Sequence, residues 1–375
     1  MTISSLSLSN FRNHLKRKFT FSLNTTIIIG KNTSGKTNLI EAIYFLSIGK
    51  SNRAGQDVQV ITFGEELARI KGELKAEGEN IVLEMVLTTG EVMGIKTPLK
   101  KFTVNDVSRR SLDFIGTLKS VLFWPEHMEL VTDSPSLRRH YLDSVLVQVD
   151  REYRRTILSY ERALRQRNRL LEYIKENKAH RHQLLFWDQL LIRQGNYITK
   201  IREEYINFIN DFKLPQMEDL GVKYQVFYDK SIISITRLDQ YREAEIGASV
   251  TLIGPQRDDM IFRIKNQVPP QRDPASGGKS KIKNNEEYFD LSNYGSRGEQ
   301  RLAVLWLKLA ELAFIESKTS EEPVLLLDDI FSELDHEHRE IIFGMIGNQQ
   351  SIVTVTDRHL IPERYYKESK VIELD

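Results

Sequence analysis

Two segments near opposite ends of the chain carry residue types that bind phosphate and divalent cations. The first matches the pattern G-x-x-x-x-G-K-[ST] in full, as Gly30-Lys31-Asn32-Thr33-Ser34-Gly35-Lys36-Thr37. Glycines in such a loop let successive backbone N–H groups face phosphate oxygens. Lys36 would place a cation on the β- and γ-phosphates, and the Thr37 hydroxyl can ligate Mg²⁺. The loop is therefore predicted to hold a nucleoside triphosphate.

The second segment is PVLLLDDIFSELD, residues 323–335. Its apolar run ends in two carboxylates, Asp328 and Asp329. Asp328 would hold Mg²⁺ directly or through water, and Asp329 would orient and polarise an attacking water. A solvated acidic turn is the structural alternative, and the phosphate-binding loop earlier in the chain argues against it.

A third segment, GSRGEQ at residues 295–300, precedes a long run with helical apolar spacing. Ser296 and Glu299 have the S-x-x-E spacing of a helix capping box. The same helix end would suit an anion, because the Ser296 hydroxyl, the Gly298 N–H and the helix dipole would converge there. We predict a helix N-terminus that can bind phosphate through Ser296, Gly298 and Glu299.

The elements around these residues predict an α/β fold of the P-loop type. Residues 25–29 (TTIII) and 324–327 (VLLL) have the composition of buried parallel strands, and so do residues 351–357. Residues 36–48 have the apolar spacing of a helix packed on a sheet. Residues 65–104 alternate in polarity between turns and predict antiparallel hairpins.

Two lobes are expected from the order of these elements. The nucleotide-binding lobe would comprise residues 1–120 and 250–375. Residues 121–249 would form a mainly helical second lobe, because residues 121–213 are rich in helix-forming residues. Residues 266–286, rich in Pro, Gly, Ser and Lys, predict a mobile loop before the segment that contains Ser296.

Composition excludes several classes of protein. The 375 residues include no cysteine, which rules out disulfides and thiolate metal sites and is typical of a reducing cytoplasm. No apolar run approaches the roughly 20 residues of a membrane span, and no signal peptide is evident. We therefore expect a cytoplasmic protein without a membrane partner. The net charge of +1 places any nucleic-acid binding in local patches.

The order of the motifs resembles that of the ABC-type ATPases. In this order the phosphate loop comes first, followed by GSRGEQ, LLLDD, SELD and the strand at residues 351–357. The resemblance implies ATP as the nucleotide, and a dimer in which Ser296 of one copy closes on the triphosphate of the other. Transporter ATPases place the first two motifs much closer together, so the long insertion here favours the chromosome-maintenance branch.

Several longer segments resemble the RecF family specifically. They are LSLSNFRNH (residues 6–14), the segment at 121–146 with PSLRRHYLD, YERALRQRN (160–168) and GPQRDD (254–259). The resemblance implies an ATP-dependent homodimer that binds DNA near single-strand gaps and acts with RecO and RecR to load RecA, supporting repair, replication and the SOS response. Departures from the family pattern are Lys31 and Thr33 in the phosphate loop, whose effect on affinity is left open, and Gln256.

The resemblance also bears on hydrolysis. The usual base of ABC-type ATPases is glutamate, and aspartate is one methylene shorter, so Asp329 predicts slow turnover. A weak DNA-dependent ATPase is expected. A DNA-binding scaffold that uses ATP without significant hydrolysis is the alternative.

An arginine-rich run is the main candidate for DNA contact. Residues 151–169 contain seven arginines and two acids. A track along the phosphate backbone would bind single-stranded, duplex or gapped DNA without reading its sequence. A solvated helix face or a subunit-docking surface would have the same composition. The candidate residues are Arg151, Arg154, Arg155, Arg162 and Arg165. Residues 16–18 (KRK) form a smaller cluster on a predicted hairpin.

Overall fold

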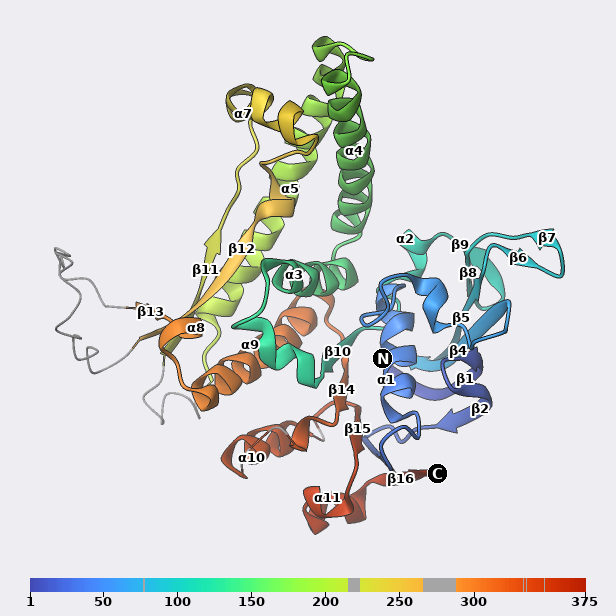
Figure 1. Cartoon of the computed structure of the whole chain (residues 1–375). Coiled ribbons are helices and arrows are strands. Elements are labelled where there is room, and N and C mark those ends of the chain that lie inside the picture. Colours follow the sequence, from blue (N-terminus) through green and yellow to red (C-terminus); the bar gives the residue numbers. More distant parts are fainter. Residues whose placement is uncertain (77, 215–222, 266–287, 333, 335, 347) are drawn as a thin grey trace. The chain divides into compact units, whose positions relative to one another are not determined.

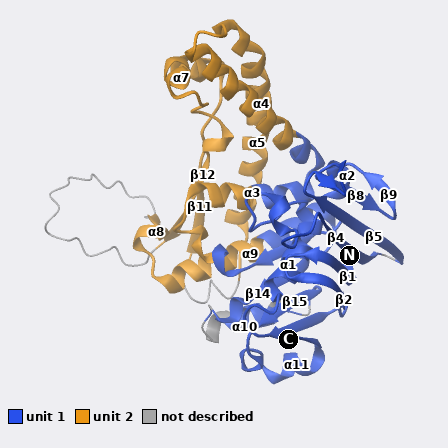
Figure 2. Ribbon diagram, turned by 45° about the vertical axis from the view of Figure 1, so that its right-hand side comes forward, with its two compact units in different colours: residues 1–127, 143–155, 311–375 blue, residues 128–142, 156–310 orange. Residues whose placement is uncertain are grey.

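The computed structural model describes the chain except for residues 77, 215–222, 266–287, 333, 335 and 347. The described residues divide into two compact units, shown in Figure 2. Unit 1 comprises residues 1–127, 143–155 and 311–375, and unit 2 comprises residues 128–142 and 156–310. The predicted loop at 266–286 lies outside the described residues.

This division differs from the two lobes expected from the sequence. Residues 250–310 belong to unit 2, and residues 143–155 belong to unit 1. At three of the points where the chain passes from one unit to the other, the boundary falls inside a continuous helix. These helices are α3 (Pro135–Val149), α4 (Arg151–Lys175) and α9 (Arg297–Thr319). Helical spacing continues across such a point, so the sequence carries no local signal of it.

A five-stranded parallel sheet forms the centre of unit 1. Its strand order is β10-β14-β15-β3-β16, with bounds Ser120–Phe123 (β10), Val324–Asp328 (β14), Ser351–Val355 (β15), Thr25–Gly30 (β3) and Lys370–Leu374 (β16). The four strands other than β16 are almost wholly buried, in keeping with their uninterrupted apolar and β-branched composition. The predicted strands at residues 25–29, 324–327 and 351–357 are confirmed. β10 was not predicted, and it spans the position of the expected lobe boundary.

A six-stranded antiparallel sheet forms the second layer of unit 1. Its order is β2-β1-β4-β5-β8-β9, with bounds His14–Thr20 (β2), Thr2–Phe11 (β1), Leu67–Ala76 (β4), Glu79–Thr88 (β5), Lys100–Val104 (β8) and Val107–Arg109 (β9). The predicted hairpins at 65–104 are confirmed, with a small extra ribbon of β6 (Glu91–Val92) and β7 (Ile95–Lys96). Side chains alternate between a buried and an open face.

Helix α1 (Lys36–Ile48) packs against both sheets of unit 1 (Figure 1). Eleven of its thirteen residues are buried, so the helix is enclosed on nearly all sides rather than along one stripe. Gly72 of β4 permits this close packing, because a Cβ atom there would lie 2.8 Å from Leu46 Cδ1. The phosphate loop is therefore anchored at both ends, by a central strand and by an enclosed helix.

Shorter elements complete unit 1. They are η1 (Asp57–Val60), α2 (Ser111–Phe114), η5 (Ile330–Ser332), α10 (His336–Met345), η6 (Arg358–Leu360) and α11 (Glu363–Glu368). A further short turn, η2 (Pro125–Leu130), follows β10. Among the helices that the structure describes, none is both long and apolar enough to cross a membrane.

Unit 2 combines helices with a small sheet. The predicted helical character of residues 121–213 is confirmed by α3, α4 and α5 (Leu184–Asp211), with η3 (Arg181–Gln183) before α5. An antiparallel sheet of order β11-β12-β13 was not predicted; its bounds are Lys223–Asp229 (β11), Asp259–Lys265 (β12) and Tyr288–Asp290 (β13). The other elements are α7 (Ile235–Ala248), η4 (Pro255–Arg257) and α8 (Leu291–Tyr294).

Candidate nucleotide-binding site

The phosphate loop of unit 1 turns between β3 and α1 under tight steric limits. Gly35 has φ of +98°, in the left-handed region that favours glycine. A Cβ atom on Gly35 would lie 2.7 Å from His14 Cε1, and one on Gly30 would lie 2.7 Å from the carbonyl oxygen of Leu374. Both glycines are therefore required by the backbone, while Lys31, Asn32 and Thr33 are exposed and Ser34 is half-buried.

Lys36 is buried at the base of this loop. Its ammonium group donates hydrogen bonds to the carbonyl oxygens of Gly30 at 2.6 Å and of Lys31 at 2.9 Å. Burial lowers the pKa of Lys36, and the charges of Asp329 and Asp328 act in the opposite direction. The loop thus holds a desolvated cation, which is an environment that strengthens its attraction for an anion.

The carboxylate of Asp328 lies directly beside the start of α1. Its Oδ1 accepts hydrogen bonds from Thr37 Oγ1 at 3.2 Å and from Thr354 Oγ1 at 2.7 Å. Asp328 is buried, and this burial raises its pKa while the two hydroxyl hydrogen bonds oppose the rise. The structure thus brings together a hydroxyl and a carboxylate separated by most of the chain. These are the hard oxygen ligands that Mg²⁺ prefers.

Asp329 follows at the edge of the same pocket. Its backbone N–H donates to Thr354 Oγ1 at 3.0 Å, and its φ of +49° lies in the left-handed region that aspartate tolerates. The pocket has a volume of about 300 Å³. It is lined by Asn32, Thr33, Gly35, Lys36, Thr37, Asn38, Arg53 and Asp329.

Several residues of this site were not predicted from the sequence. Arg53 lines the pocket and donates to Asn38 Oδ1 at 3.1 Å. Arg12 holds α1 in place through Glu41 of that helix. It donates hydrogen bonds to both carboxylate oxygens of the buried Glu41, at 2.9 and 2.7 Å. Thr354 could have been found, since it lies near the carboxyl end of a predicted parallel strand, where such sheets place ligand chemistry. Arg12 lies in the RecF-like segment at residues 6–14, which could have pointed to it, whereas no local sequence signal marks Arg53.

The predicted anion-binding helix terminus lies in unit 2. Ser296 and Gly298 are exposed, and α9 begins at Arg297. Glu299 accepts from the Ser296 backbone N–H at 2.7 Å and from its hydroxyl at 2.8 Å, while the Glu299 N–H donates to Ser296 Oγ at 3.3 Å. The capping box expected from the sequence is therefore formed, on a helix end that faces solvent.

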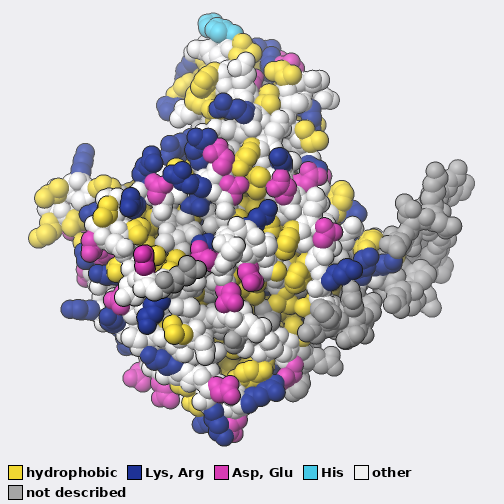
Figure 3. Space-filling model, turned by 180° about the vertical axis from the view of Figure 1, so that it is seen from behind, with side chains coloured by type: hydrophobic (Ala, Val, Ile, Leu, Met, Phe, Trp, Pro, Cys, Tyr) yellow, Lys and Arg dark blue, Asp and Glu magenta, His cyan; other side chains and the backbone are white. Residues whose placement is uncertain are grey.

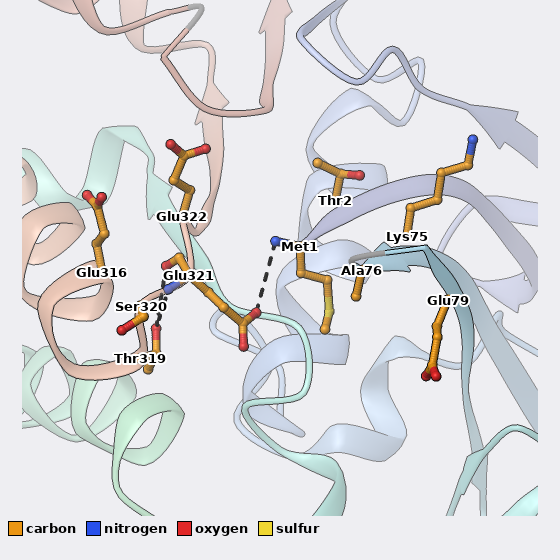
Figure 4. A pocket seen from close by; sticks show the side chains of 10 residues that line it. All are labelled: Met1, Thr2, Lys75, Ala76, Glu79, Glu316, Thr319, Ser320, Glu321 and Glu322. Atoms are coloured by element: carbon orange, nitrogen blue, oxygen red, sulfur yellow. Dashed lines mark hydrogen bonds and ion pairs between the residues drawn. The ribbon is translucent and has the colours of Figure 1, made fainter.

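A larger cavity in unit 1, of about 760 Å³, has a mainly acidic lining (Figure 4). Its lining includes four glutamates, Glu79, Glu316, Glu321 and Glu322. The amino group of Met1 lies 4.0 Å from Glu321, as the dashed line in Figure 4 marks. Carboxylates in this number would repel a triphosphate, so the smaller pocket beside Lys36 is the site that fits one.

The arginine-rich run on α4 is used partly for internal contacts. Arg154 donates to the carbonyl oxygens of Leu112 and Ile115. Arg151 pairs with Asp113 at 2.6 Å, and Arg155 pairs with Glu152 one turn away. Basic and acidic side chains are likewise interspersed on the face seen in Figure 3.

Two further arginines of the run, Arg162 and Arg165, are exposed. Arg167, in contrast, is fully buried between Asp188 and Glu245, at 2.7 Å from each. The run is therefore less basic at the surface than its composition indicates.

Arg167→Ala is expected to destabilise the protein by about 3–5 kcal/mol, because it removes the cation that lies 2.7 Å from two buried carboxylates and leaves only the more distant Arg242, 3.9 Å from Asp188. Arg165→Ala, two residues away on the exposed side, should change stability by less than about 0.5 kcal/mol. Urea unfolding of both variants followed by circular dichroism measures the difference. Equal stability of the two variants would contradict a structural role for Arg167.

His14 links the stability of the phosphate loop to pH. Its Nε2 lies 3.1 Å from the carbonyl oxygen of Gly35, and burial lowers its pKa below the ordinary 6.5. The unfolded chain therefore binds the proton more readily, so the stability present above pH 6.5 is lost as the pH falls through the lower pKa of the folded state. We expect the unfolding free energy to fall on acidification, with a smaller slope in His14→Gln. Identical slopes would exclude this linkage.

Thr33 adopts φ of +77°, which is strained for a β-branched residue. Thr33→Gly is expected to raise stability by about 1 kcal/mol, since the strain relieved exceeds the added chain entropy of glycine. Asn32 has no such backbone angle, so Asn32→Gly serves as the control and should lower stability by about 0.5–1 kcal/mol. Thermal unfolding compares the two. A loss of stability in both variants would argue against strain at Thr33.

The fold and this site together define a P-loop protein of the ABC-ATPase type. A family model described as the RecF/RecN/SMC N terminal domain matches residues 2–369. The DNA replication and repair protein RecF of Lachnoclostridium phytofermentans is 32% identical over 365 residues, which cover 95% of this chain and 93% of that protein. The chain therefore belongs to the RecF family.

Solved structures give the same assignment. The structure described as the recombination mediator protein RecF-ATPrS in the RecFOR pathway has a TM-score of 0.82 at 28% identity. The match covers 100% of this chain and 96% of the chain in that structure. A second structure, described as RecF-ATP, has a TM-score of 0.80 at 29% identity and covers 96% and 93% of the two chains.

Proposed function

We propose that this chain is an ATP-dependent DNA-binding protein of recombinational repair and replication. The observation that carries the proposal is the 3.2 Å contact between Thr37 Oγ1 and Asp328 Oδ1 beside the buried Lys36. A cation, a hydroxyl and a carboxylate converge on one pocket at the carboxyl edge of a parallel sheet. Relatives named DNA replication and repair protein, and structures named RecF-ATP, support DNA and adenine nucleotide as ligands.

The loop from Gly30 to Thr37 would hold the phosphates of ATP, and Thr37 with Asp328 would ligate Mg²⁺. The donor set fits this ion, because Mg²⁺ is usually bound through one or two protein oxygens together with substrate phosphates. When bound, Mg²⁺ would neutralise the charge that develops on the transferring phosphate. Asp329 would orient the attacking water. Its short side chain supports slow hydrolysis.

A second copy of the chain would complete the site. Ser296, Gly298 and Glu299 of the partner subunit would close on the γ-phosphate, so that ATP joins the two copies and hydrolysis releases them. The solvent exposure of the capped helix end supports this role, since a buried terminus could not reach another molecule. The closed dimer would clamp DNA near single-strand gaps. In the cytoplasm it would act with RecO and RecR to promote RecA loading and SOS induction.

Mass measurement by light scattering tests the proposal. Without nucleotide the chain should be monomeric, and with ATP, Mg²⁺ and gapped duplex DNA its mass should double and include DNA. A chain that stays monomeric under every condition would refute the ATP-dependent clamp.

An ATP-binding DNA scaffold without significant hydrolysis is the second candidate. The short side chain of Asp329 favours this candidate, because a carboxylate too far from the attacking water would leave ATP uncleaved. Single-turnover hydrolysis measured with and without DNA separates the two functions. Release of phosphate that DNA accelerates supports the ATPase, whereas bound ATP that persists for hours supports the scaffold.

A further inference from the structure

The open face of the six-stranded sheet in unit 1 is strongly basic. The other face of this sheet is buried and packs on α1, which lies on that side in Figure 1. The alternation of the strands places two carboxylates, Glu73 and Glu84, on the open face. The basic side chains on the same face are Lys16, Lys18, Arg69, Lys71, Lys75 and Lys101.

The register of the strands arranges four of these cations around two serines. Ser7 of β1 lies opposite Lys18 of β2 on one side and opposite Lys71 of β4 on the other. Ser9 lies in the same way between Lys16 and Arg69. Directly opposed Cβ atoms are about 4.5–5.5 Å apart, and the two rows are separated by about 7 Å along the strands. We call Ser7, Ser9 and the four cations that flank them (Lys16, Lys18, Arg69 and Lys71) the basic sheet face.

The carboxylates on this side neutralise only part of the charge. Lys18 lies 3.5 Å from Glu73, and Arg69 lies 3.1 Å from Glu84, and both cations are more than half exposed. Ion pairs at this exposure are weak and screened by salt. Within the part of the chain that the structure describes, no carboxylate lies within 4 Å of the Lys16 or Lys71 ammonium group. An open sheet face is normally polar, but it does not normally concentrate one sign of charge in a chain of net charge +1.

We propose that the basic sheet face binds the phosphate backbone of double-stranded DNA. This inference rests on the proposed function and assigns it a surface that the arginine run on α4 does not include. Rows of cations flanking hydroxyl groups are the donors that contact phosphates in protein–DNA interfaces. Among the described residues of β1, β2, β4, β5 and β8, no aromatic side chain lies on the open face. Base stacking, which holds single strands, therefore has no platform there.

The test removes the charge of the basic sheet face without altering the fold. One variant carries Lys16→Gln, Lys18→Gln, Arg69→Gln and Lys71→Gln. The control removes the same number of exposed cations elsewhere, Lys178, Lys200, Arg364 and Lys367. Fluorescence anisotropy with a labelled 30-base-pair duplex (about three helical turns) and ATP is measured over a salt series.

The variant should bind the duplex at least tenfold more weakly, with a salt slope smaller by about 3–4, since each lost phosphate contact removes about 0.9 from the slope. The control should bind within about twofold of the parent protein. ATP affinity should be unchanged in both. A charge-conserving set (Lys→Arg and Arg69→Lys) should restore the binding.

The outcomes separate the two proposals. Equal DNA binding by variant and parent would overturn the basic sheet face and leave the proposed function standing. A parent protein that binds no DNA with ATP would overturn both. If the fourfold variant lost binding to anionic lipid vesicles while its DNA binding stayed intact, the inference would also be refuted. Should the fourfold variant fail to fold, Ser9→Glu is compared with Ser108→Glu at the far edge of the sheet, and only the first should weaken DNA binding.

Discussion

Lys36→Met is expected to lower ATP affinity by roughly two orders of magnitude, because truncating one member of a desolvated charge pair costs about 2–5 kcal/mol. The lysine is 6% exposed and is held at the base of the loop by two carbonyl oxygens. Methionine has similar length and no charge, so it fills the space without replacing the cation. Titration calorimetry with ATP and Mg²⁺ measures the loss.

A control for this experiment is available in the same loop. Lys31 is exposed, and Lys31→Met should change ATP affinity by less than about threefold. Because dimerisation in the proposed function depends on bound ATP, Lys36→Met should also remain monomeric when ATP is added. Undiminished ATP binding by Lys36→Met would refute the assignment of the phosphate loop.

Ser296→Arg is expected to abolish ATP-induced dimerisation while the single copy still binds ATP normally. The long charged side chain would block the approach of the exposed helix end to a partner's triphosphate, and the dimer fraction at micromolar concentration should fall more than tenfold. Loss of the cap should cost only about 1 kcal/mol of stability. Light scattering and calorimetry on the same sample report the two properties separately.

The matched control adds the same charge elsewhere in unit 2. Gln240 is exposed on α7, so Gln240→Arg should dimerise like the parent protein. A Ser296→Arg variant that dimerises with ATP would exclude Ser296 from the interface. One that loses ATP binding as well would place Ser296 in the site of its own chain.

The local parts of the site could be predicted from the sequence because the spacing of a few residues determines them. Loop geometry follows from Gly30, Gly35 and the strand and helix on either side. The capping box at Ser296 and Glu299 is likewise a four-residue property. In both cases the side chains interact with backbone that lies next to them in sequence.

Contacts between distant segments could not be predicted in this way. Nothing near Arg53 indicates that it lines the pocket with Asn38. The arginines of α4 look alike in sequence, yet Arg167 is buried and Arg165 is exposed, because only tertiary packing brings Asp188 and Glu245 to one of them. The division into units was also predicted differently, since helices pass from one unit to the other without a break in their spacing.

The position of β3 in its sheet has a consequence for biosynthesis. Both of its neighbours, β15 and β16, come from the last 25 residues of the chain, so the strand that carries the phosphate loop has no partner while the ribosome makes the intervening segment. At about 5–20 residues per second, this wait lasts on the order of 15–65 s. During that time an apolar, β-branched segment is exposed to chaperones and to other nascent chains, and the ability to bind nucleotide arises only after β15 and β16 have been made.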